Sequence, residues 1–596
     1  MTETSGPVIR AKNVNLDGTL NIASPASQEP IRSTDDLISL ALIESDNAIS
    51  GDFDDITING NAMNPDAFIT VVGQKNVNDT HYDLVETLTW YADRDNAAID
   101  AHGTFNLADA DDSFTVNTVL EDVDANSGWN GQSLTKTGAG TLILNAENTY
   151  TGSTTISEGT LIATNVEALG TGNVTDNATL EMNTGGDFDN AISGSGQVVK
   201  SGDETLTLSG ANSYTGGTTI SGGTLVASNV EALGTGDITD NATLELNAGG
   251  DFANNIGGTG SVVKSGDKTL TLSGSNTYTG GTTISGGTLV ASNVEALGSG
   301  DVTDNATLEL STGGDFANNI GGTGSVVKSG DKTLTLSGTN SYTGGTTISG
   351  GTLVANNVEA LGTGDVTNNA TLELNTGGDF TNAISGSGQV VKSGDKTLTL
   401  SGANSYTGGT TISGGTLVAN DVNALGTGDV TDNATLALNA VGDFNNAIGG
   451  SGKVEKSGDD TLTLSGSNTY TGGTLINGGT LVASNVEALG TGDVTDDATL
   501  ELNTGGDFDN AISGSGQVVK SGDETLTLSG SNTYTGGTLI SSGTLVANDV
   551  NALGTGDVTD NAVLELNTGG DFINSIGGTG RVEKSGDETL TLSGSN

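Results

Sequence analysis

Residues 520–538 read KSGDETLTLSGSNTYTGGT, and nearly the same phrase recurs along most of the 596-residue chain. Its lysine returns with a constant 64-residue period, at Lys136, Lys200, Lys264, Lys328, Lys392, Lys456, Lys520 and Lys584. A fixed period without insertions indicates repeats that stack on one another, because each repeat buries its apolar face only against a neighbour. The sequence therefore predicts one continuous stack of repeats rather than a string of globular domains.

Within each repeat, short segments of the form Thr-Leu-x-apolar alternate apolar and polar residues. In the repeat that begins at Lys200 they start at Thr205, Thr224 and Thr243, and the next one starts at Thr269. Such alternation is typical of half-buried strands. The intervals between these starts suit one coil of a parallel β-helix, so we expect an all-β solenoid with about three coils per 64-residue repeat. An array of separate β-sandwiches is disfavoured, because aromatic residues make up only 4% of the chain.

The period divides the chain into two regions. Residues 134–596 hold seven 64-residue β-helix repeats plus a truncated eighth. Residues 1–133 lack the period and are expected to form an irregular β-rich N-terminal segment or divergent β-helix coils, with strands at ITVVG (69–73), DLVETLTWYAD (83–93) and TFNL (104–107). Residues 229–236 (NVEALGTG) are long enough for a single helical turn or loop and no more.

Composition excludes several classes of function. The net charge of −55, with only 18 basic residues, excludes a nucleic-acid footprint and electrostatic docking on anionic lipid. The absence of cysteine excludes disulfides and thiolate metal sites. No apolar run reaches the roughly 18–20 residues of a membrane span. The first residues show no basic stretch followed by an apolar one, and the repeat pattern stops mid-repeat, so we interpret the sequence as a fragment.

No catalytic residue is predicted. Nearly every acid is copied from repeat to repeat, and Asp203 with its copies is expected to support the tight SGD turns and to pair with Lys200. His81 and His102 are separated in sequence by the length of one coil, yet two histidines without a shared role are the simpler interpretation. The protein is therefore not expected to be an enzyme.

Calcium is the one cofactor that the acidic residues suggest, as a weak ligand. Asp122, Asp124 and Asn126 resemble the start of an EF-hand loop, but Ser127 and Ser133 replace its glycine and its last glutamate. These three residues are weak calcium candidates, and no other cofactor is expected. Acids stacked from coil to coil would repel across about 5 Å, and divalent cations would relieve that repulsion.

The pattern K-x-G-x-x-T-L-x-L-x-x-x-N-x-Y-T-G-x-T-x-I-x-x-G-T-L, present at residues 136–161 and in later copies, resembles the autotransporter-associated β-strand repeat of type V secretion passengers. Residues 230–246 are similar to the continuation of such repeats. The resemblance implies a right-handed parallel β-helix of the pectin lyase-like kind, export through the outer membrane, and display on a Gram-negative cell or secretion from it. It also implies membrane attachment only through a C-terminal barrel, which this sequence does not contain.

Repetition and resemblance together lead to an expected function. A long, acidic, repetitive β-helix suits adhesion, self-aggregation or biofilm formation, with many weak contacts added together by multivalency. The expected partners are host or neighbouring-cell surface molecules, or the same protein on adjacent cells, and not nucleic acid. The alternative is a passive stalk that presents another domain.

Overall fold

The computed structural model describes residues 6–23, 30–92, 98–125, 127–402 and 404–596. Contacts divide the chain into two compact units, Met1–Leu289 with Glu295–Gly300, and Val290–Val294 with Asp301–Asn596. In the described ranges the regular structure is β-strand apart from two short 3-10 turns, η1 (Thr34–Asp36) and η2 (Thr89–Tyr91). No helix in these ranges is long and apolar enough to cross a membrane.

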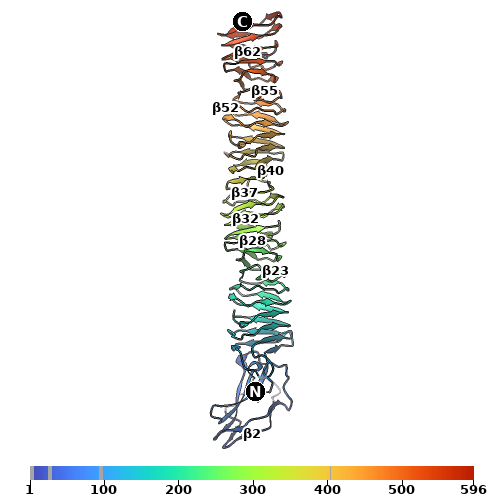
Figure 1. Cartoon of the computed structure of the whole chain (residues 1–596), viewed down its shortest axis with the longest axis vertical. Helices are drawn as coiled ribbons and strands as arrows, with labels where there is room; N and C mark the ends of the chain where they lie inside the picture. The colour runs from blue at the N-terminus through green and yellow to red at the C-terminus, as the bar shows by residue number, and fades with distance from the viewer. Residues whose placement is uncertain (1–5, 24–29, 93–97, 126, 403) are drawn as a thin grey trace. The chain divides into compact units, whose positions relative to one another are not determined.

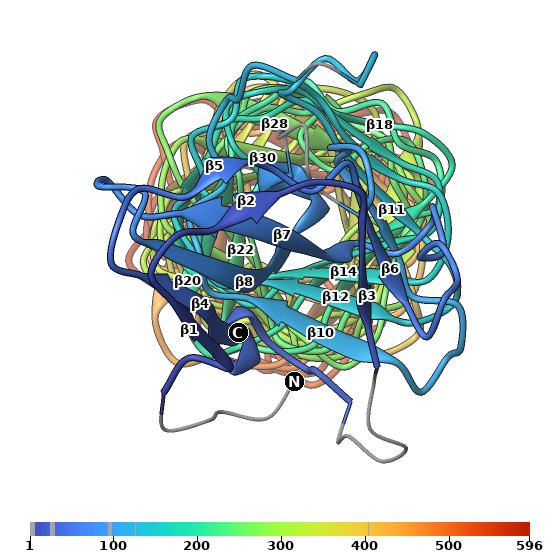
Figure 2. The same cartoon turned by 90° about the horizontal axis from the view of Figure 1, so that it is seen from below.

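The N-terminal part of the first unit is an irregular β-sheet structure. Four strands lie side by side in the order β1 (Ile9–Ala11), β4 (Ser39–Ser45), β8 (His81–Leu88) and β7 (Ile69–Lys75), with β8 antiparallel to both neighbours (Figure 2). Two small parallel pairs accompany them, β2 (Asn15–Leu16) with β5 (Ser50–Gly51) and β3 (Thr19–Ile22) with β6 (Asp55–Ile58). The predicted strand at 83–93 ends earlier than expected, because residues 89–91 turn into η2.

Parallel coils begin before the 64-residue period does. Strand β9 (Thr104–Asn106) pairs in parallel with β11 (Leu134–Thr137), and β10 (Ser113–Val116) pairs with β12 (Thr141–Leu144). Residues 104–116 thus form a divergent coil against which the first repeat packs. Trp90 lies 4.8 Å from Trp129 and 5.4 Å from Tyr150 between ring centroids, so aromatic contacts also connect this region to the first repeat.

Each repeat contributes eight strands to a parallel β-helix. In the first unit one repeat comprises β19 (Gln197–Lys200), β20 (Thr205–Leu208), β21 (Thr218–Ile220), β22 (Thr224–Ala227), β23 (Ile238–Asp240), β24 (Thr243–Leu246), β25 (Gly250–Phe252) and β26 (Ile256–Gly257). The predicted parallel β-helix is confirmed. The predicted turn at 229–236 is a hydrogen-bonded turn in which Ala232 N–H donates to Asn229 O.

The register shows that coils are shorter than the sequence spacing suggested. Gly186 of β17 (Gly186–Phe188) pairs with Leu206, Leu206 with Leu225, Leu225 with Leu244, and Leu244 with Val262 of β27 (Ser261–Lys264). Along this series the number of residues per turn does not increase from one turn to the next. The partner of Thr243 is Ser261 and not, as predicted, Thr269. The Gly/Asn cluster at residues 247–252 is a turn signal, yet it contains strand β25, and β25 and β26 together make the coil close before Thr269.

A consequence is that one repeat makes more than three turns. Val198 and Val262 occupy the same position in successive repeats, so they would lie in one ladder if a repeat made a whole number of turns. Instead Val198 lies in the ladder of Leu180, whereas Val262 lies in a different ladder, the one that holds Leu206. Turns of the observed length fit a 64-residue repeat about three and a third times. Each repeat in the unit is therefore rotated by one side of the coil relative to the repeat before it.

The second unit is built in the same way. One of its repeats comprises β51 (Lys453–Lys456), β52 (Thr461–Leu464), β53 (Thr474–Ile476), β54 (Thr480–Ala483), β55 (Val494–Asp496), β56 (Thr499–Leu502), β57 (Gly506–Phe508) and β58 (Ile512–Ser513). Figure 1 shows strands of this unit, such as β32 (Thr307–Leu310) and β40 (Thr371–Leu374), stacked as short parallel rungs. The apolar side chains of each rung face inward, and Leu462, Leu481 and Leu500 are fully buried.

Buried asparagines continue the hydrogen bonding where the coil has no strand. Between β50 (Ile448–Gly449) and β57, two successive turns cross one side of the coil as loops. Asn468, 3% exposed, accepts a bond from Ile448 N–H (2.7 Å) and donates to Ala488 O (2.6 Å). Asn510 then donates to Gly490 O (3.1 Å) and Gly492 O (2.7 Å). Side-chain amides thus replace the ladder bonds that these loops lack.

We predict that Asn468→Ala destabilises its repeat by about 2–5 kcal/mol, because it leaves one buried N–H and one buried carbonyl without a partner. Amide hydrogen exchange near Ile448, followed by mass spectrometry, measures the loss. Asn439→Ala is the matched control, since Asn439 is exposed and its amide contacts only Asn420 at 3.3 Å. Equal exchange in the two variants would show that the buried amide has no such role.

Candidate binding clefts

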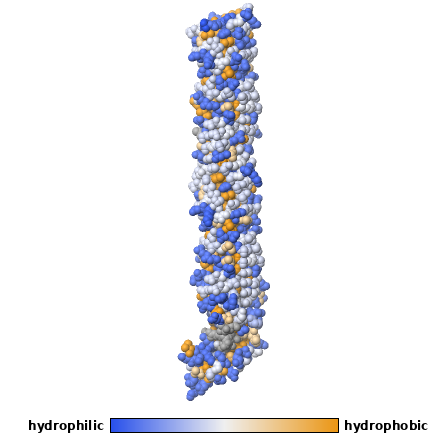
Figure 3. All heavy atoms as spheres, viewed as in Figure 1, coloured by the Kyte–Doolittle hydropathy of each residue, from blue (hydrophilic) through white to orange (hydrophobic). Residues whose placement is uncertain are grey.

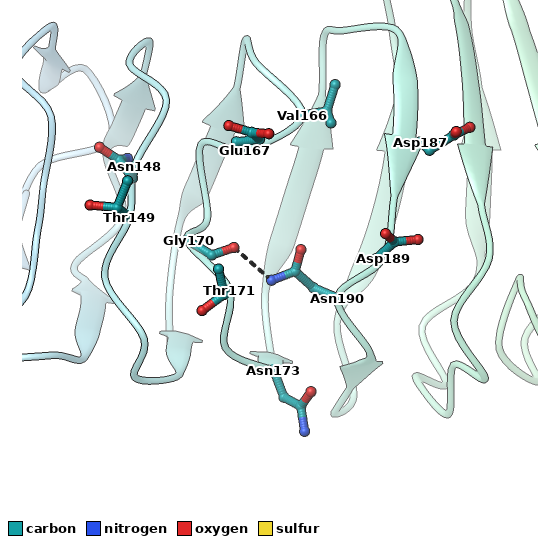
Figure 4. A pocket seen from close by; sticks show the side chains of 10 residues that line it. All are labelled: Asn148, Thr149, Val166, Glu167, Gly170, Thr171, Asn173, Asp187, Asp189 and Asn190. Atoms are coloured by element: carbon teal, nitrogen blue, oxygen red, sulfur yellow. Dashed lines mark hydrogen bonds between the residues drawn. The ribbon is translucent and has the colours of Figure 1, made fainter.

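The described surface has a polar cleft where loops of three successive turns meet. The first such cleft, of about 380 Å³, is lined by Asn148, Thr149, Val166, Glu167, Gly170, Thr171, Asn173, Asp187, Asp189 and Asn190 (Figure 4). These residues come from the loop just before Tyr150, from residues 166–173, which begin with the VEALG turn (166–170), and from residues 187–190 in and after β17. A cleft of about 500 Å³ recurs one repeat later, lined by Ala211, Asn212, Ser213, Val230, Glu231, Gly234, Thr235, Asp251, Ala253 and Asn254.

Hydrogen bonds fix the floor of the first cleft. Asn190 donates to Gly170 O (3.0 Å) and to Gly172 O (2.6 Å), and the first of these bonds is drawn in Figure 4. Asn148 donates to Ala168 O at 2.6 Å and accepts from Leu120 N–H at 2.7 Å. The cleft is therefore formed by the same amide ladder that holds the loops in place, and its shape is set before any ligand arrives.

A glycine keeps one wall of the cleft open. Gly186 has a φ of +110°, and a Cβ at this position would lie 2.7 Å from Cγ1 of Val166. Only glycine adopts such a backbone without strain, and only glycine leaves Val166 its place. The second glycine before Asp-Phe is thus required by the wall of the cleft as well as by the turn, whereas the first is replaced by Val441 in one repeat.

Acidic and amide groups dominate the chemistry of the clefts. Glu167 is exposed at the rim, and the carboxylates of Asp187 and Asp189 lie on the opposite wall (Figure 4). Asp189 accepts a bond from Ser209 Oγ at 2.6 Å. Figure 3 shows hydrophobic residues only as scattered spots on the visible face, so hydroxyl, amide and carboxylate groups are what the surface offers a partner.

Of the calcium candidates, Asp122 already uses both carboxylate oxygens in hydrogen bonds. Asp122 Oδ1 accepts from Thr151 N–H (2.8 Å), and its Oδ2 accepts from Thr151 Oγ1 (2.8 Å) and Gln132 Nε2 (3.2 Å). Asp124 is exposed, and Asn126 lies outside the described residues. Among the residues that the structure describes, no group of three or more His, Asp or Glu side chains is placed to hold a metal ion.

Acids do stack directly at one rung, where Glu565 pairs with Glu583, but at Glu245 the expected repulsion between stacked acids is relieved. Glu245 lies between Val226 and Val263 in its ladder, so its neighbours along the stack are apolar. Its Oε1 also accepts a bond from Ser265 Oγ at 2.5 Å. Because successive repeats are rotated, equivalent acids do not stack on one another here.

The expected pairing of Lys200 with Asp203 is replaced by another arrangement. The Lys200 side chain points inward, and its Nζ donates to Ser201 O (2.5 Å), Gly202 O (2.8 Å) and Gly222 O (3.3 Å). Burial lowers the pKa of Lys200, and it lowers the pKa of the equivalent Lys136 to about 8. These carbonyls form a cage around the ammonium group of Lys200. The sequence could have predicted it, because Lys200 follows the buried Val198 by two positions and therefore lies on the inward face of the same strand.

The two histidines also have local partners. His81 Nδ1 lies 3.1 Å from Asn76 Nδ2, and His102 Nδ1 accepts from Thr104 N–H at 3.2 Å. Burial lowers the pKa of His102. Both rings are thus engaged by neighbouring groups of the N-terminal region.

A family model described as the passenger-associated-transport-repeat matches eight stretches of the chain. They are residues 134–163, 198–227, 262–291, 326–355, 390–419, 454–483, 518–547 and 582–596. The match at 198–227 spans β19 to β22, including the caged lysine, Asn212 and Tyr214. The chain is an autotransporter passenger built of these repeats.

The passenger is also similar to the adhesin BmaC autotransporter of Brucella suis biovar 1 (strain 1330). The two are 29% identical over 577 residues, which cover 81% of this chain and 15% of that protein. The passenger thus spans a small part of the length of this relative. The VEALG turns and the Gly-Gly-Asp-Phe strands that wall the two clefts fall outside the matched repeat stretches, so the clefts are built largely by the residues between them.

Proposed function

We propose that this passenger acts in adhesion at the surface of a Gram-negative bacterium, as a displayed or secreted chain. Its partners would be surface molecules of host or neighbouring cells, or the same chain on an adjacent cell, and its action a binding one without catalysis. The observation that carries the proposal is a cleft at equivalent residues of two successive repeats, one repeat of 64 residues apart. Similarity to an autotransporter adhesin supports it.

Repetition makes weak binding useful. The first cleft, of about 380 Å³ and mostly polar, suits a hydroxyl- or amide-rich ligand held by few bonds, and the second, of about 500 Å³, offers more apolar surface to the same kind of ligand. Several clefts on one chain raise the effective concentration for each further contact. The position of Asp189 is occupied by Ala253, Ala317, Thr381, Asn445, Asp509 and Ile573 in later repeats, although most of the repeat is invariant. Repeats would therefore differ in what they prefer, which suits adhesion to heterogeneous surfaces, self-aggregation and biofilm formation.

Replacing the rim glutamates tests the clefts directly. We expect that changing Glu167, Glu231, Glu295, Glu359 and Glu487 to Gln lowers, by at least fivefold, the number of chain-coated beads retained on host-cell monolayers after washing. The matched control changes Asp203, Asp267, Asp331, Asp395 and Asp523 to Asn, which removes five exposed charges from the SGD turns instead. If both variants lose retention equally, general charge and not the clefts is responsible.

The second candidate function, a passive stalk, is distinguished by shortening the chain. We expect deletion of residues 326–389 to reduce bead retention, and deletion of residues 326–453 to reduce it further, because each deletion removes clefts while keeping the period. A stalk would keep its binding through both deletions and lose only reach. Unchanged retention in both variants would therefore favour the stalk.

Pairing between like chains should depend on ions. The repeat at residues 200–263 carries six acids outside the core, while Asp240 and the one lysine are buried, so two such surfaces repel until salt screens them. We expect clumping of chain-coated beads to be absent in dilute buffer with a chelator and to appear with about 0.15 M salt or millimolar Ca²⁺. Equal clumping in all three buffers would contradict pairing through acidic surfaces, and a response to Ca²⁺ beyond that to salt would support the weak calcium ligand.

A further inference from the structure

Six aspartates of the β-helix point into its core. They are the third residues of the short Ile/Val-Thr-Asp strands, and the set comprises Asp176, Asp240, Asp304, Asp432, Asp496 and Asp560. Their exposed fractions are 0% for five of them and 2% for Asp560. A charged carboxylate in such a place is costly unless its oxygens are fully hydrogen-bonded.

One oxygen of each carboxylate has a partner and the other has none. In Asp240 the Oδ1 atom accepts from Ala242 N–H at 3.0 Å, and the same bond of 3.0 Å is made by the other five. The Oδ2 atom is buried without a hydrogen-bond partner in all six. A buried acceptor repeated six times without a donor calls for an explanation.

The fourth full repeat provides a natural comparison, because Asn368 occupies the same position. Its Oδ1 accepts from Ala370 N–H at 3.2 Å, as the aspartates do, and its Nδ2 donates to Gln389 O at 2.9 Å. Asn368 is also fully buried. Nδ2 of Asn368, which corresponds to the unpaired Oδ2 of the aspartates, therefore faces a backbone carbonyl. An atom in this place can bond to that carbonyl only if it carries a hydrogen.

The glycine beside each carboxyl group leaves no room for a side chain there. A Cβ on Gly260 would lie 2.4 Å from Asp240 Oδ1 and 2.6 Å from its Oδ2, and a Cβ on Gly388 would lie 2.6 Å from Asn368 Oδ1. No side chain at this position can therefore supply the missing donor, and the comparison with Asn368 indicates a hydrogen on Oδ2 itself.

We infer that the six inward-facing aspartates are proton-binding sites, and that each protonated Oδ2 donates to the backbone carbonyl equivalent to that of Gln389. The carbonyls are those of Gln197, Ser261, Ser325, Lys453, Gln517 and Arg581. The proton comes from solvent when the chain folds or opens locally. The β-helix would then be more stable in mild acid than at neutral pH.

The groups that face these aspartates do not supply another counter-charge. For Asp240 they are Tyr278, which acts on it electrostatically but bonds Thr282 Oγ1 at 2.6 Å, and Lys200, which lies two rungs away in the same inward column and is held by carbonyls. Asp497 lies beside Asp496 and disfavours its charge further.

Burial raises the pKa of Asp176, Asp240, Asp304, Asp432 and Asp496 to about 6. In the unfolded chain an aspartate titrates near 3.9. The folded state therefore holds these protons more tightly, so their contribution to stability is complete below about pH 4 and is lost as the pH rises through about 6. Two pH units correspond to about a hundredfold in the unfolding equilibrium for each of these five aspartates.

Thermal unfolding of the full chain at pH 5 and pH 7.5 tests this inference with variants that the repeats themselves suggest. Asn368→Asp adds a seventh site, and we expect it to lower the melting temperature at pH 7.5 by several degrees, with a much smaller change at pH 5. Changing all six aspartates to Asn is expected to raise the melting temperature at pH 7.5 and to remove most of its dependence on pH. The control changes six exposed acids to Asn, namely Asp203, Asp267, Asp331, Asp395, Asp459 and Asp523. Because the buried aspartates are unchanged, we expect this control to keep the pH dependence of the melting temperature.

Infrared spectroscopy gives a direct readout. At pH 5 the wild type should absorb more strongly in the band of protonated carboxylic acids than the sixfold Asn variant, and the surface control should keep most of that excess. An equal loss of stability in Asn368→Asp at both pH values would overturn the inference, and so would identical carboxylic-acid absorption in the wild type and the sixfold variant.

Discussion

The constraint on which this fold depends is that every turn must pass its backbone hydrogen bonds to the next turn on all sides of the coil. Strands do so where Thr and Leu alternate. Where the chain crosses as a loop, a buried asparagine does so, as Asn468 does between Ile448 and Ala488. The other features follow from this requirement. Buried lysines donate to the carbonyls of the turns, and glycines allow neighbouring turns to approach closely. The clefts lie in the spaces between the loops.

The candidate clefts and the internal aspartates are two outcomes of the same arrangement. On the outside, loops held by amide bonds leave polar hollows that recur with the repeat. On the inside, the in–out alternation of the Val-Thr-Asp strands places a carboxyl group in the core with one oxygen unpartnered, and we propose that a proton completes its bonding. The surface would thus serve binding, while the interior would set the conditions under which the coil is most stable.

Much of the fold could be predicted from the sequence, because alternation and period report directly on which residues face inward. The strands at Thr205, Thr224 and Thr243 were identified on that basis, and so was the parallel stacking. The Gly-Asp-Phe strands were not, since glycine pairs normally indicate turns and only Phe252 points inward. The clefts could not be predicted, because they depend on residues a full turn apart whose proximity follows from the register. The lysine cage and the buried aspartates were missed because charged residues are expected at the surface.

The extra third of a turn in each repeat has a consequence for how such a chain can change. Tandem copies of nearly identical coding sequence gain and lose whole units by recombination, and every backbone rung stays continuous when they do. One added copy nevertheless turns everything beyond it within that stack to another side of the coil, whereas three added copies restore the original direction. Variation in copy number would therefore alter which way the far end faces as well as how far it reaches.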